Sequence, residues 1–593
     1  MGSILAKSIN LSGGEFLIKD TDPQDVYIPE EISEEQKMIR DMATQFMKSE
    51  VGERSHQLEH QAELLEKAGA IGLLGAHMPE QYGGMQLDSI TNAIIAEEIG
   101  KYGASFNTTW AAHTGIGMLP ILYFGTEDQK KKYLPKLVTG EWKSAYCLTE
   151  PSSGSDALAA RTRAELNQAG SHYVLNGQKM WISNAGFADI FIVFAKIDGT
   201  DFTGFIVEAK TKGIKLGEEE KKLGIKGSST RQVFFEQAAV PVENLLGEKG
   251  KGHLIAFNAL NIGRFRLGNM ALGGCKRATS VSIAYANERH QFNRPISAFG
   301  AIKYKLAQQA ILTFALETAV YRVADMFEKQ KLNLLQQGMR PEIASLRVAE
   351  EFAIECTFIK VAGSEYLDYV IDEMLQIHGG YGYSEEYPAA RAYRDARINR
   401  IYEGTNEINR LLIINMLLKK AMKGNLDIAG PAWDVQKELA RMPSFTNTDG
   451  IFGAEKKALS DFKKLTLMVL GAAAKMQMDG VLDLKEEQEI VMNGANMLID
   501  VFFAESLLLR LEKMHLSGQT DQIHTDILKT YFWDVNSKMA CEANNALVSF
   551  ATGDLLKTFL LGVKRFTGYP PVNVKLARRR IADHLIEKGT YSL

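Results

Sequence analysis

One acidic residue, Glu403, stands where its side chain could act as a base. It lies in the stretch "IYEGTNEI" between Tyr402 and Gly404, directly ahead of Thr405-Asn406, a polar pair typical of a helix start. A carboxylate placed among apolar groups loses hydration, which raises its pKa toward the range where it accepts protons at neutral pH. The same residues are also typical of a solvated acid in a loop, so this stretch alone leaves both interpretations open.

Five other stretches are rich in glycine, hydroxyl, aromatic, amide or arginine residues. They are "YCLTEPSSGSD" (146–156), "NGQKMWISNAG" (176–186), "LNIGRFR" (260–266), "RHQFNRPI" (289–296) and "QIHGGYGY" (376–383). Taken singly, each has an ordinary structural interpretation: a turn after an edge strand, a tryptophan in a strand core, a surface arginine, or a helix C-cap. His378 has no companion at metal-ligand spacing and is interpreted as a packing residue.

The elements that must position these side chains change in pattern along the chain. Early segments are helical, with capping boxes predicted at Ser33/Gln36 and Thr126/Gln129. Short β-branched and aromatic segments follow, and Asn176-Gly177 predicts a hairpin turn between two of them. Such closely spaced strands favour an antiparallel sandwich or barrel over βαβ units. Long amphipathic runs then return and predict a helical bundle.

We therefore predict an α+β protein built from five parts. These are an N-terminal arm (1–30), a helical domain (31–143), an antiparallel β-sandwich or barrel domain (144–253), a four-helix bundle carrying Glu403 (254–425) and an extra C-terminal helical domain (426–593).

Composition excludes several classes of protein. The 593 residues are 46% hydrophobic and 24% charged, which is typical of a globular protein with more than one domain. A net charge of −4 does not favour nucleic acid, and no Rossmann or P-loop motif occurs. Four scattered cysteines lack metal-site spacing and are expected to be buried free thiols. The first residues, "MGSILAKSIN", lack the apolar core of a secretory signal, so we expect a cytoplasmic protein.

Together, "YCLTEPSSGSD", "NGQKMWISNAG", "RHQFNRPI", "QIHGGYGY" and "RIYEGTNEI" resemble the acyl-CoA dehydrogenase family in their residues, order and separation. The resemblance covers roughly residues 30 to 425. The long C-terminal addition and Gly263-Arg264 are most similar to the very-long-chain branch. That resemblance implies FAD as cofactor and a long-chain acyl-CoA as substrate, desaturated between Cα and Cβ to a trans-2-enoyl-CoA in β-oxidation. Electrons would pass to an electron-transferring flavoprotein.

In that family the glutamate of "YEGT" removes the α-proton, which here is Glu403. Its backbone N–H would help to polarise the thioester carbonyl, and Gly404 would let the backbone approach the substrate closely. Thr405 and Asn406 would begin a helix whose free N–H groups suit a flavin phosphate. Some branches of the family place their base near this arginine, but Gly263 stands beside Arg264 here, so no competing acid occupies that position.

The resemblance also assigns cofactor and substrate contacts. The flavin would be held by Tyr146, Leu148, Thr149, Trp181 and Ser183 of one chain, and by Arg289, Gln291, Phe292, Gln376, Gly379 and Gly380 of a neighbouring chain. The CoA thioester would meet Ser155, Asn261, Arg264 and Gly404. Because each flavin site would draw on two chains, we expect a homo-oligomer, and the extension favours a dimer.

Two rival functions stay open on the sequence. An acyl-CoA oxidase would share the first half-reaction and pass electrons to O₂. A scaffold or assembly factor would keep the fold while catalysis became secondary. The basic run "KLARRRIADHLIEK" could touch an anionic membrane, but acids follow its arginines, so a solvated final helix is favoured.

Overall fold

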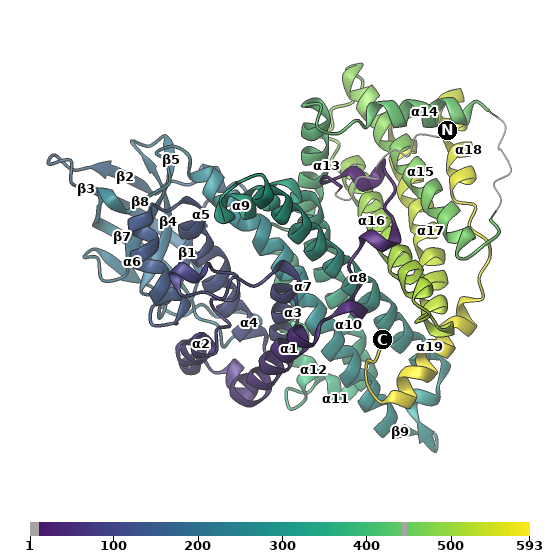
Figure 1. The fold of residues 1–593 in the computed structure, drawn as a ribbon, viewed down its shortest axis with the longest axis horizontal. Coiled ribbons are helices and arrows are strands. Elements are labelled where there is room, and N and C mark those ends of the chain that lie inside the picture. Colours follow the sequence, from purple (N-terminus) through teal and green to yellow (C-terminus); the bar gives the residue numbers. More distant parts are fainter. Residues whose placement is uncertain (1–10, 442–447) are drawn as a thin grey trace.

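The computed structural model describes residues 11–441 and 448–593. Its elements form a β domain at one end of an elongated molecule, a helical centre, and a helical extension at the other end (Figure 1). The first ten residues, on which the expectation about a signal sequence rests, lie outside the described part.

The N-terminal helices begin where their capping residues predict. Ser33 Oγ accepts a hydrogen bond from Gln36 N at 3.2 Å, and Thr126 Oγ1 accepts one from Gln129 N at 3.2 Å. Both predicted capping boxes are therefore confirmed. The helices of this domain are α1 Glu34–Phe46, α2 Gln61–Ala70, α3 Ser89–Gly100, α4 Ala104–Ala111, α5 Leu119–Phe124 and α6 Glu127–Val138. A π-helical turn, Ala112–Gly117, joins α4 to the segment before α5.

The β domain is a mixed sheet. Its strands are β1 Ser144–Cys147, β2 Arg163–Leu166, β3 His172–Ser183, β4 Ile190–Ile197, β5 Asp201–Glu208, β6 Ile214–Leu216, β7 Thr230–Pro241 and β8 Leu245–Leu246. They run in the order β6-β7-β3-β2-β4-β5-β8, with β1 paired to β4. Most pairs are antiparallel as predicted, but β4 pairs in parallel with both β1 and β2. The predicted β domain is confirmed, and β4 is the strand that makes it mixed.

The predicted hairpin turn at Asn176-Gly177 is wrong. Both residues lie inside β3, where the register against β7 shifts between Leu175 and Gly177. A Cβ atom at Gly177 would lie 2.5 Å from Thr162 Oγ1, and Asn176 Oδ1 accepts from Gln237 N at 2.9 Å. The pair therefore forms a β-bulge within the strand. Glycine is common in bulges as well as in turns, because it lets another backbone approach closely.

The helical centre is organised around two long helices that cross closely. Its elements are α7 Gly252–Glu288, β9 His290–Gln291, β10 Arg294–Pro295, α8 Gly300–Gln336, α9 Pro341–Glu351, α10 Ala353–His378, α11 Gly380–Tyr383, α12 Pro388–Ala396 and α13 Asn406–Met422. Helix α10 packs against α7, α8 and α13. A Cβ atom at Gly268 would lie 2.3 Å from Ile359 O, and one at Gly363 would lie 2.9 Å from Gly268 Cα. The two glycines thus let the backbones of α7 and α10 meet.

The extension is a further helical layer against the bundle. It contains α14 Ala429–Leu439, α15 Gly453–Met478, α16 Gln488–Leu516, α17 Gln522–Phe550, α18 Gly553–Phe566 and α19 Val574–Lys588. Helix α16 packs against α8 and α13, and α19 returns to α8. Among the described residues α16 alone has the length and composition of a membrane span, and 83% of its most apolar window is buried inside this fold. Arg578 and Arg580 of α19 pair with Asp534 and Asp526, so the predicted solvated helix is packed and ion-paired on one side.

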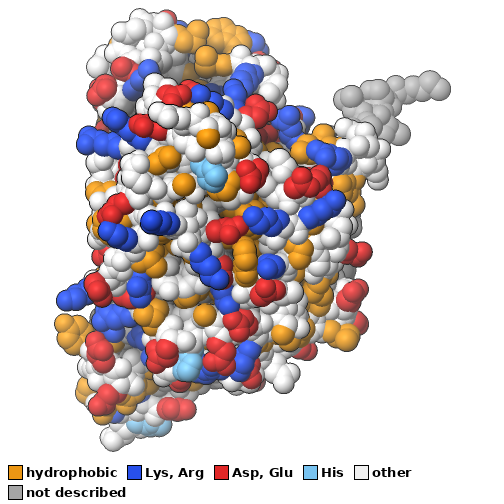
Figure 2. Space-filling model, turned by 90° about the vertical axis from the view of Figure 1, so that its left-hand side faces the viewer, with side chains coloured by type: hydrophobic (Ala, Val, Ile, Leu, Met, Phe, Trp, Pro, Cys, Tyr) orange, Lys and Arg blue, Asp and Glu red, His pale blue; other side chains and the backbone are white. Residues whose placement is uncertain are grey.

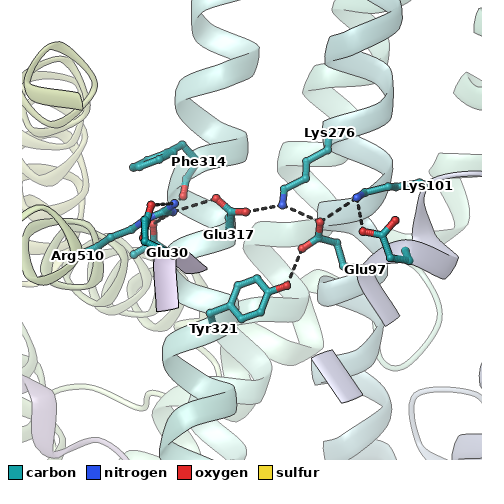
Figure 3. Close-up of polar contacts among 10 residues, drawn as sticks. Glu30, Glu97, Lys101, Lys276, Phe314, Glu317, Tyr321 and Arg510 are labelled. Atoms are coloured by element: carbon teal, nitrogen blue, oxygen red, sulfur yellow. Dashed lines mark hydrogen bonds and ion pairs between the residues drawn. The ribbon is translucent and has the colours of Figure 1, made fainter. Parts of the chain in front are cut away.

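Buried charges connect the arm, the bundle and the extension. Arg510 of α16 contacts Glu30 of the N-terminal arm at 2.7 Å and Glu317 of α8 at 3.0 Å. Glu317 also pairs with Lys276 of α7, which lies 2.7 Å from Glu97 of α3 (Figure 3). Each buried cation of this network therefore meets two carboxylates.

The outer surface mixes charges of both signs. On the face shown in Figure 2, acidic and basic side chains alternate and hydrophobic side chains are scattered between them. Of the four cysteines, Cys147, Cys275 and Cys356 are buried free thiols as expected, whereas Cys541 is exposed. The expectation for Cys541 is wrong because the outer face of α17 carries it.

Candidate active site

Glu403 occupies a strained turn between two helical segments. Its φ is 58°, and that of Gly404 is 83°, so both residues have left-handed backbone conformations. A non-glycine residue in this region costs roughly 1–3 kcal/mol and persists only where its surroundings hold it. The left-handed turn explains why the acid lies just before α13 and not within its first turn: in this position its carboxyl group lies next to Gly263 of α7.

Three side chains from different helices hold this turn by its carbonyl groups. Arg264 Nε of α7 donates to Glu403 O at 3.2 Å. Lys360 Nζ of α10 donates to Gly404 O at 2.7 Å, and Asn409 Nδ2 of α13 donates to the same oxygen at 2.8 Å. Sequence reasoning missed Lys360 and Asn409. A lone lysine within the apolar run "TFIKVAG" was the available signal for the first.

The carboxyl group of Glu403 lies against a gap in α7. A Cβ atom built on Gly263 would lie 2.9 Å from Glu403 Oε2 and 3.2 Å from Cδ, so a larger residue at position 263 would displace the carboxylate. Oε2 is buried and has no hydrogen-bond partner among the described residues. Gly263 therefore makes room for an acid whose oxygen is left free for another molecule.

Burial dominates the electrostatics of this acid. It raises the pKa of Glu403 to about 7, and the positive charges of Arg264 and Lys360 oppose the rise only in part. Burial likewise lowers the pKa of Lys360 to about 7, against the attraction of Glu403. A carboxyl group that exchanges its proton near neutrality suits a general base.

Arg264 has a structural role in the turn, in addition to its predicted contact with the substrate. It is buried, and its Nη1 donates to Asn261 Oδ1 at 2.9 Å while Nε holds Glu403 O. The two predicted substrate-binding residues of α7 thus contact one another next to the base. Ser155 is exposed in the turn after β1, with no fixed contact to them.

The C-terminal end of β1 lies near Glu403 and α7. Tyr146 is buried, and its hydroxyl group donates to Ala256 O of α7 at 3.4 Å. Burial raises the pKa of Tyr146 well above its usual value, and the nearby charge of Glu403 adds to the rise. Leu148 O accepts from Lys179 Nζ at 3.1 Å, and Thr149 O accepts from Met180 N at 2.9 Å. These bonds fix the strand end whose Thr149 hydroxyl was predicted to meet a flavin.

Trp181 is unusual for a large aromatic residue in a sheet. Its φ is 57°, it lies in the register shift between Lys179 and Ile182, and 59% of its surface is exposed. The bulge turns the indole out of the strand pairing instead of into the core, so it is not the strand-core residue of the simpler interpretation. Ser183, half-buried, ends the same strand. An exposed aromatic face held in a strained bulge fits a planar ring that stacks there.

Thr405 and Asn406 are both committed to structure at the start of α13. Thr405 Oγ1 accepts from Ile408 N at 3.2 Å, which makes it the N-cap. Asn406 Oδ1 accepts from Lys360 Nζ at 2.7 Å, and its Nδ2 donates to Glu365 Oε1 at 3.0 Å. The Asn406 side chain is thus engaged inside the protein, so contact with a phosphate would come from the backbone of this helix start.

The remaining predicted cofactor residues gather at the opposite end of α7. Arg289 follows Glu288, about 39 Å of helix from Gly263. Gln291 and Phe292 lie in the short β9–β10 hairpin, where Phe292 has φ of 52° and 87% of its surface exposed. Nearby are the exposed Gln376, Gly379 and Gly380. This group cannot reach the Glu403 site of its own chain, as expected if it completes the site of a neighbour.

Local packing explains part of this second cluster. His378 is buried and stacks on Tyr285 with ring centres 3.9 Å apart, in line with its interpretation as a packing residue. Gly379 has φ of 59° and ψ of −135°, a conformation restricted to glycine, and caps α10. No described atom lies within 4 Å of a Cβ built on Gly379 or Gly380, so the glycines leave open space.

A channel of about 290 Å³ begins at Tyr402, next to the base. It runs between α7 and α10 toward α4 and α12, and sequence reasoning did not locate it. Small and apolar side chains dominate the part along α7 and α10: Leu267, Ala271, Gly274, Ala278, Leu367 and Ile371.

Comparison with known proteins places this arrangement in a family. Models of the N-terminal, middle and C-terminal domains of acyl-CoA dehydrogenases match residues 33–141, 145–238 and 250–418, and a further acyl-CoA dehydrogenase C-terminal domain model matches 461–565. A probable acyl-CoA dehydrogenase of Bacillus subtilis is 44% identical over 588 residues, covering 98% of each chain. The very long-chain specific mitochondrial enzyme of Homo sapiens is 42% identical over 352 residues, 58% of this chain and 51% of that protein.

A solved structure supports the same assignment. The crystal structure of an acyl-CoA dehydrogenase complexed with FAD from Bacillus anthracis superposes with a TM-score of 0.95 at 44% identity, over 98% of this chain and all of that one. This chain belongs to the acyl-CoA dehydrogenase family, a class of FAD-dependent oxidoreductases, so the predicted family, enzyme class and cofactor are confirmed. The strained, exposed Trp181 and the unpartnered Glu403 Oε2 fit a flavin and an acyl thioester between them.

Proposed function

We propose that this protein desaturates long-chain acyl-CoA thioesters between Cα and Cβ, with Glu403 as the base. The observation that carries the proposal is the Glu403 carboxyl group, which is buried, faces Gly263, has an oxygen without a partner and has a pKa raised to about 7 by burial. Such a group removes the α-proton of a bound thioester and holds it at a carboxylate oxygen.

The surrounding residues orient the substrate for that step. Arg264, Lys360 and Asn409 hold the carbonyl groups of the turn, so the Glu403 backbone N–H is directed at the thioester oxygen and stabilises the negative charge that develops there. When bound, FAD supplies the acceptor for the hydride that leaves Cβ. Trp181 would cover the flavin ring, and the apolar side chains along α7 and α10 would limit the access of water to the proton transfer.

The channel beside Tyr402 supports a long acyl chain. Its wall follows α7 from Leu267 to Val281, about 21 Å at 1.5 Å per residue. Alanines and glycines along this wall leave space that bulkier side chains would fill. The similarity to the human very long-chain specific enzyme supports the same preference.

We further propose a cytoplasmic homodimer that passes its electrons to an electron-transferring flavoprotein in β-oxidation. The separation of the Arg289 group from Glu403 of the same chain supports a site shared by two chains. Anaerobic reduction followed by mixing with either O₂ or an oxidised electron-transferring flavoprotein tests the acceptor. Fast reoxidation by the flavoprotein and slow reoxidation by O₂ are expected, and the reverse order would identify an oxidase.

The function is tested by mixing the yellow enzyme anaerobically with saturated acyl-CoAs of graded chain length. Bleaching of the flavin band should be fastest with long chains such as palmitoyl-CoA. Bleaching only by butyryl-CoA would refute the chain-length proposal, and a protein that binds no flavin would favour the scaffold.

A further inference from the structure

A second cavity, of about 120 Å³, lies between α3, α5, α7, α8 and α9. Phe265, Arg266 and Asn269 of α7 line it, whereas Leu267 and Met270 line the channel beside Tyr402. The two spaces share no lining residue among the described part of the chain, so this cavity is separate from the candidate active site.

Most of the cavity wall is apolar, and one end is cationic. The apolar wall contains Leu87, Ala93, Leu119, Leu122, Ile262 and Phe327. Arg266, His77 and Tyr123 contribute polar groups to the same space. Lys331 and Glu342 also line it, and Glu342 lies 3.9 Å from Lys130 and 3.5 Å from Arg340. A ligand that fits these walls has an aliphatic body and one charged or strongly polar end.

The guanidinium group of Arg266 has only neutral partners. Its Nη1 donates to Thr114 Oγ1 at 3.1 Å, its Nη2 donates to His77 Nδ1 at 3.1 Å, and it lies 5.6 Å from the ring centre of Trp110. Burial lowers the pKa of Arg266 to about 10, so the group still carries its charge at neutral pH. Burial and the charge of Arg266 also lower the pKa of His77, which is therefore neutral.

His77 adds an unused donor to this end of the cavity. Because its Nδ1 accepts from Arg266, the proton of the neutral imidazole is on Nε2. That Nε2 is buried and has no partner among the described residues. A cation and a free N–H donor thus belong to the same small cavity, and both favour an anionic oxygen.

Several other interior cations pair with carboxylates, whereas Arg264 and Lys360 at the candidate active site hold backbone carbonyl groups. Arg510 meets Glu30 and Glu317, and Lys276 meets Glu97 and Glu317 (Figure 3). No carboxylate of the described residues lies within ion-pair distance of Arg266. A half-buried cation with only neutral hydrogen-bond partners in a mostly apolar cavity favours an anion from outside as a further partner.

We propose that this cavity is a binding site for a short-chain aliphatic monocarboxylate. The carboxylate accepts hydrogen bonds from Arg266 and from His77 Nε2, and the alkyl tail lies against the apolar wall. A cavity of ~150 Å³ holds benzene, so the present volume accommodates an acid of about four carbons. The site takes a free acid, which distinguishes it from the CoA thioester of the proposed reaction.

Binding of butyrate to the FAD-loaded enzyme tests the site. Calorimetry at pH 7 should detect butyrate binding and a rise in Tm with butyrate concentration. Butyramide and butylammonium have similar tails without the negative charge and should not bind. Arg266→Met should weaken butyrate binding by at least about tenfold, whereas Arg347→Met, at an exposed position of α9, should leave it unchanged.

A second variant tests the site independently, in case Arg266→Met does not fold. Ala349→Met fills the tail space from α9 and leaves Arg266 in place, so it should also abolish butyrate binding. A crystal soaked in butyrate should show its carboxylate on Arg266. Equal affinity in wild type and both variants, or equal protection by chloride alone, would overturn the proposal.

Discussion

Glu403 combines three features that cost stability. It is a non-glycine residue with φ of 58°, its carboxyl group is buried, and Oε2 lacks a partner. Each feature is costly for an acid that only fills space, and all three suit one that must meet a substrate proton. Arg264, Lys360 and Asn409 maintain the conformation from three different helices.

Replacing Glu403 by glutamine should stabilise the FAD-loaded enzyme at high pH. The carboxyl pKa is about 7 when folded, against an ordinary value near 4.3 when unfolded. The folded state therefore binds the proton more tightly, and its stability falls as pH rises through the window from about 4.5 to 7. Glutamine cannot ionise, so Glu403→Gln should be roughly 3–4 kcal/mol more stable at pH 8 and nearly equal at pH 4.

Chemical denaturation at both pH values measures this effect. Glu407→Gln is the control, because Glu407 is exposed in the first turn of α13 and its pKa is lowered. A Glu403→Gln enzyme less stable than wild type at pH 8 would show that the carboxylate is compensated in the folded protein.

Gly263→Ala should impair catalysis without removing the base. The new Cβ would lie 2.9 Å from Glu403 Oε2, so the carboxylate must move. We expect kcat to fall by about tenfold or more, as small displacements of catalytic groups do, with flavin absorbance retained. Gly300→Ala, whose Cβ meets only the flexible end of Arg579 at 3.2 Å, is the control. Unchanged kcat in Gly263→Ala would contradict the geometry.

At the scale of elements, the close crossing of α7 and α10 brings the base, its supports and the channel together. Gly268 and Gly363 let the two backbones meet, which brings Lys360 to the turn that carries Glu403. The channel then follows the same two helices away from the turn. We therefore predict that side chains along α7 limit the length of the acyl chain that the enzyme accepts.

Ala278→Phe should shorten the accepted chain. Ala278 is buried at the distal part of the channel, and a phenyl group there fills space that a long tail needs. Turnover of palmitoyl-CoA should fall by at least about tenfold while that of butyryl-CoA is unchanged, since each unmet methylene contact costs about 0.8 kcal/mol. Ala284→Phe, at an exposed position of α7, should leave both rates unchanged. Equal loss for both substrates would place the acyl chain elsewhere.

Elements defined by local chemistry were predictable from sequence, and those defined by distant contacts were not. Ser33/Gln36 and Thr126/Gln129 form capping boxes because both partners lie within one helical turn. Asn176-Gly177 failed because neighbouring strands, and not the dipeptide, decide between a turn and a bulge. The parallel pairing of β4 with β1 and β2 depends on chain paths that no local pattern records.

In the candidate site, too, residues marked by a local motif were predictable and those brought together by distant contacts were not. The motif around Glu403 identifies it in the sequence. Lys360 was not predicted, because it lies 44 positions before Gly404 in the chain and contacts it only in the folded protein. The cavity holding Arg266 likewise depends on five helices that meet only in the folded protein.

At the scale of the whole molecule, the two ends of α7 lie too far apart to contribute to one site within a single chain. The Arg289 group lies about 39 Å of helix from Gly263. A dimer in which each Arg289 completes the flavin site of its neighbour would use both ends.

Mixed dimers test this sharing. Glu403→Gln and Arg289→Glu should each be inactive alone, the first lacking the base and the second lacking a cofactor contact in the neighbouring site. A heterodimer formed by coexpression contains one site with Glu403 from one chain and Arg289 from the other, so activity should return to about half of wild type per dimer. No recovery in purified heterodimers would show that each site lies within one chain.

The buried ion-pair network should contribute strongly to the docking of the extension. Arg510→Met leaves Glu30 and Glu317 without their shared cation, and breaking a buried pair costs roughly 3–5 kcal/mol. Arg340→Met, at an exposed position, should change the free energy of unfolding by less than about 0.5 kcal/mol. Thermal denaturation of both variants distinguishes the two, and equal Tm values would show that the network contributes little.

The central claim is that one buried carboxyl group removes the α-proton of an acyl thioester beside a flavin. Its most direct test is anaerobic mixing of palmitoyl-CoA with FAD-loaded wild type and Glu403→Gln in a stopped-flow spectrometer. The wild-type flavin band should bleach, and the variant should bind the same substrate while bleaching at least about a thousandfold more slowly. Bleaching of the variant at the wild-type rate would contradict the account.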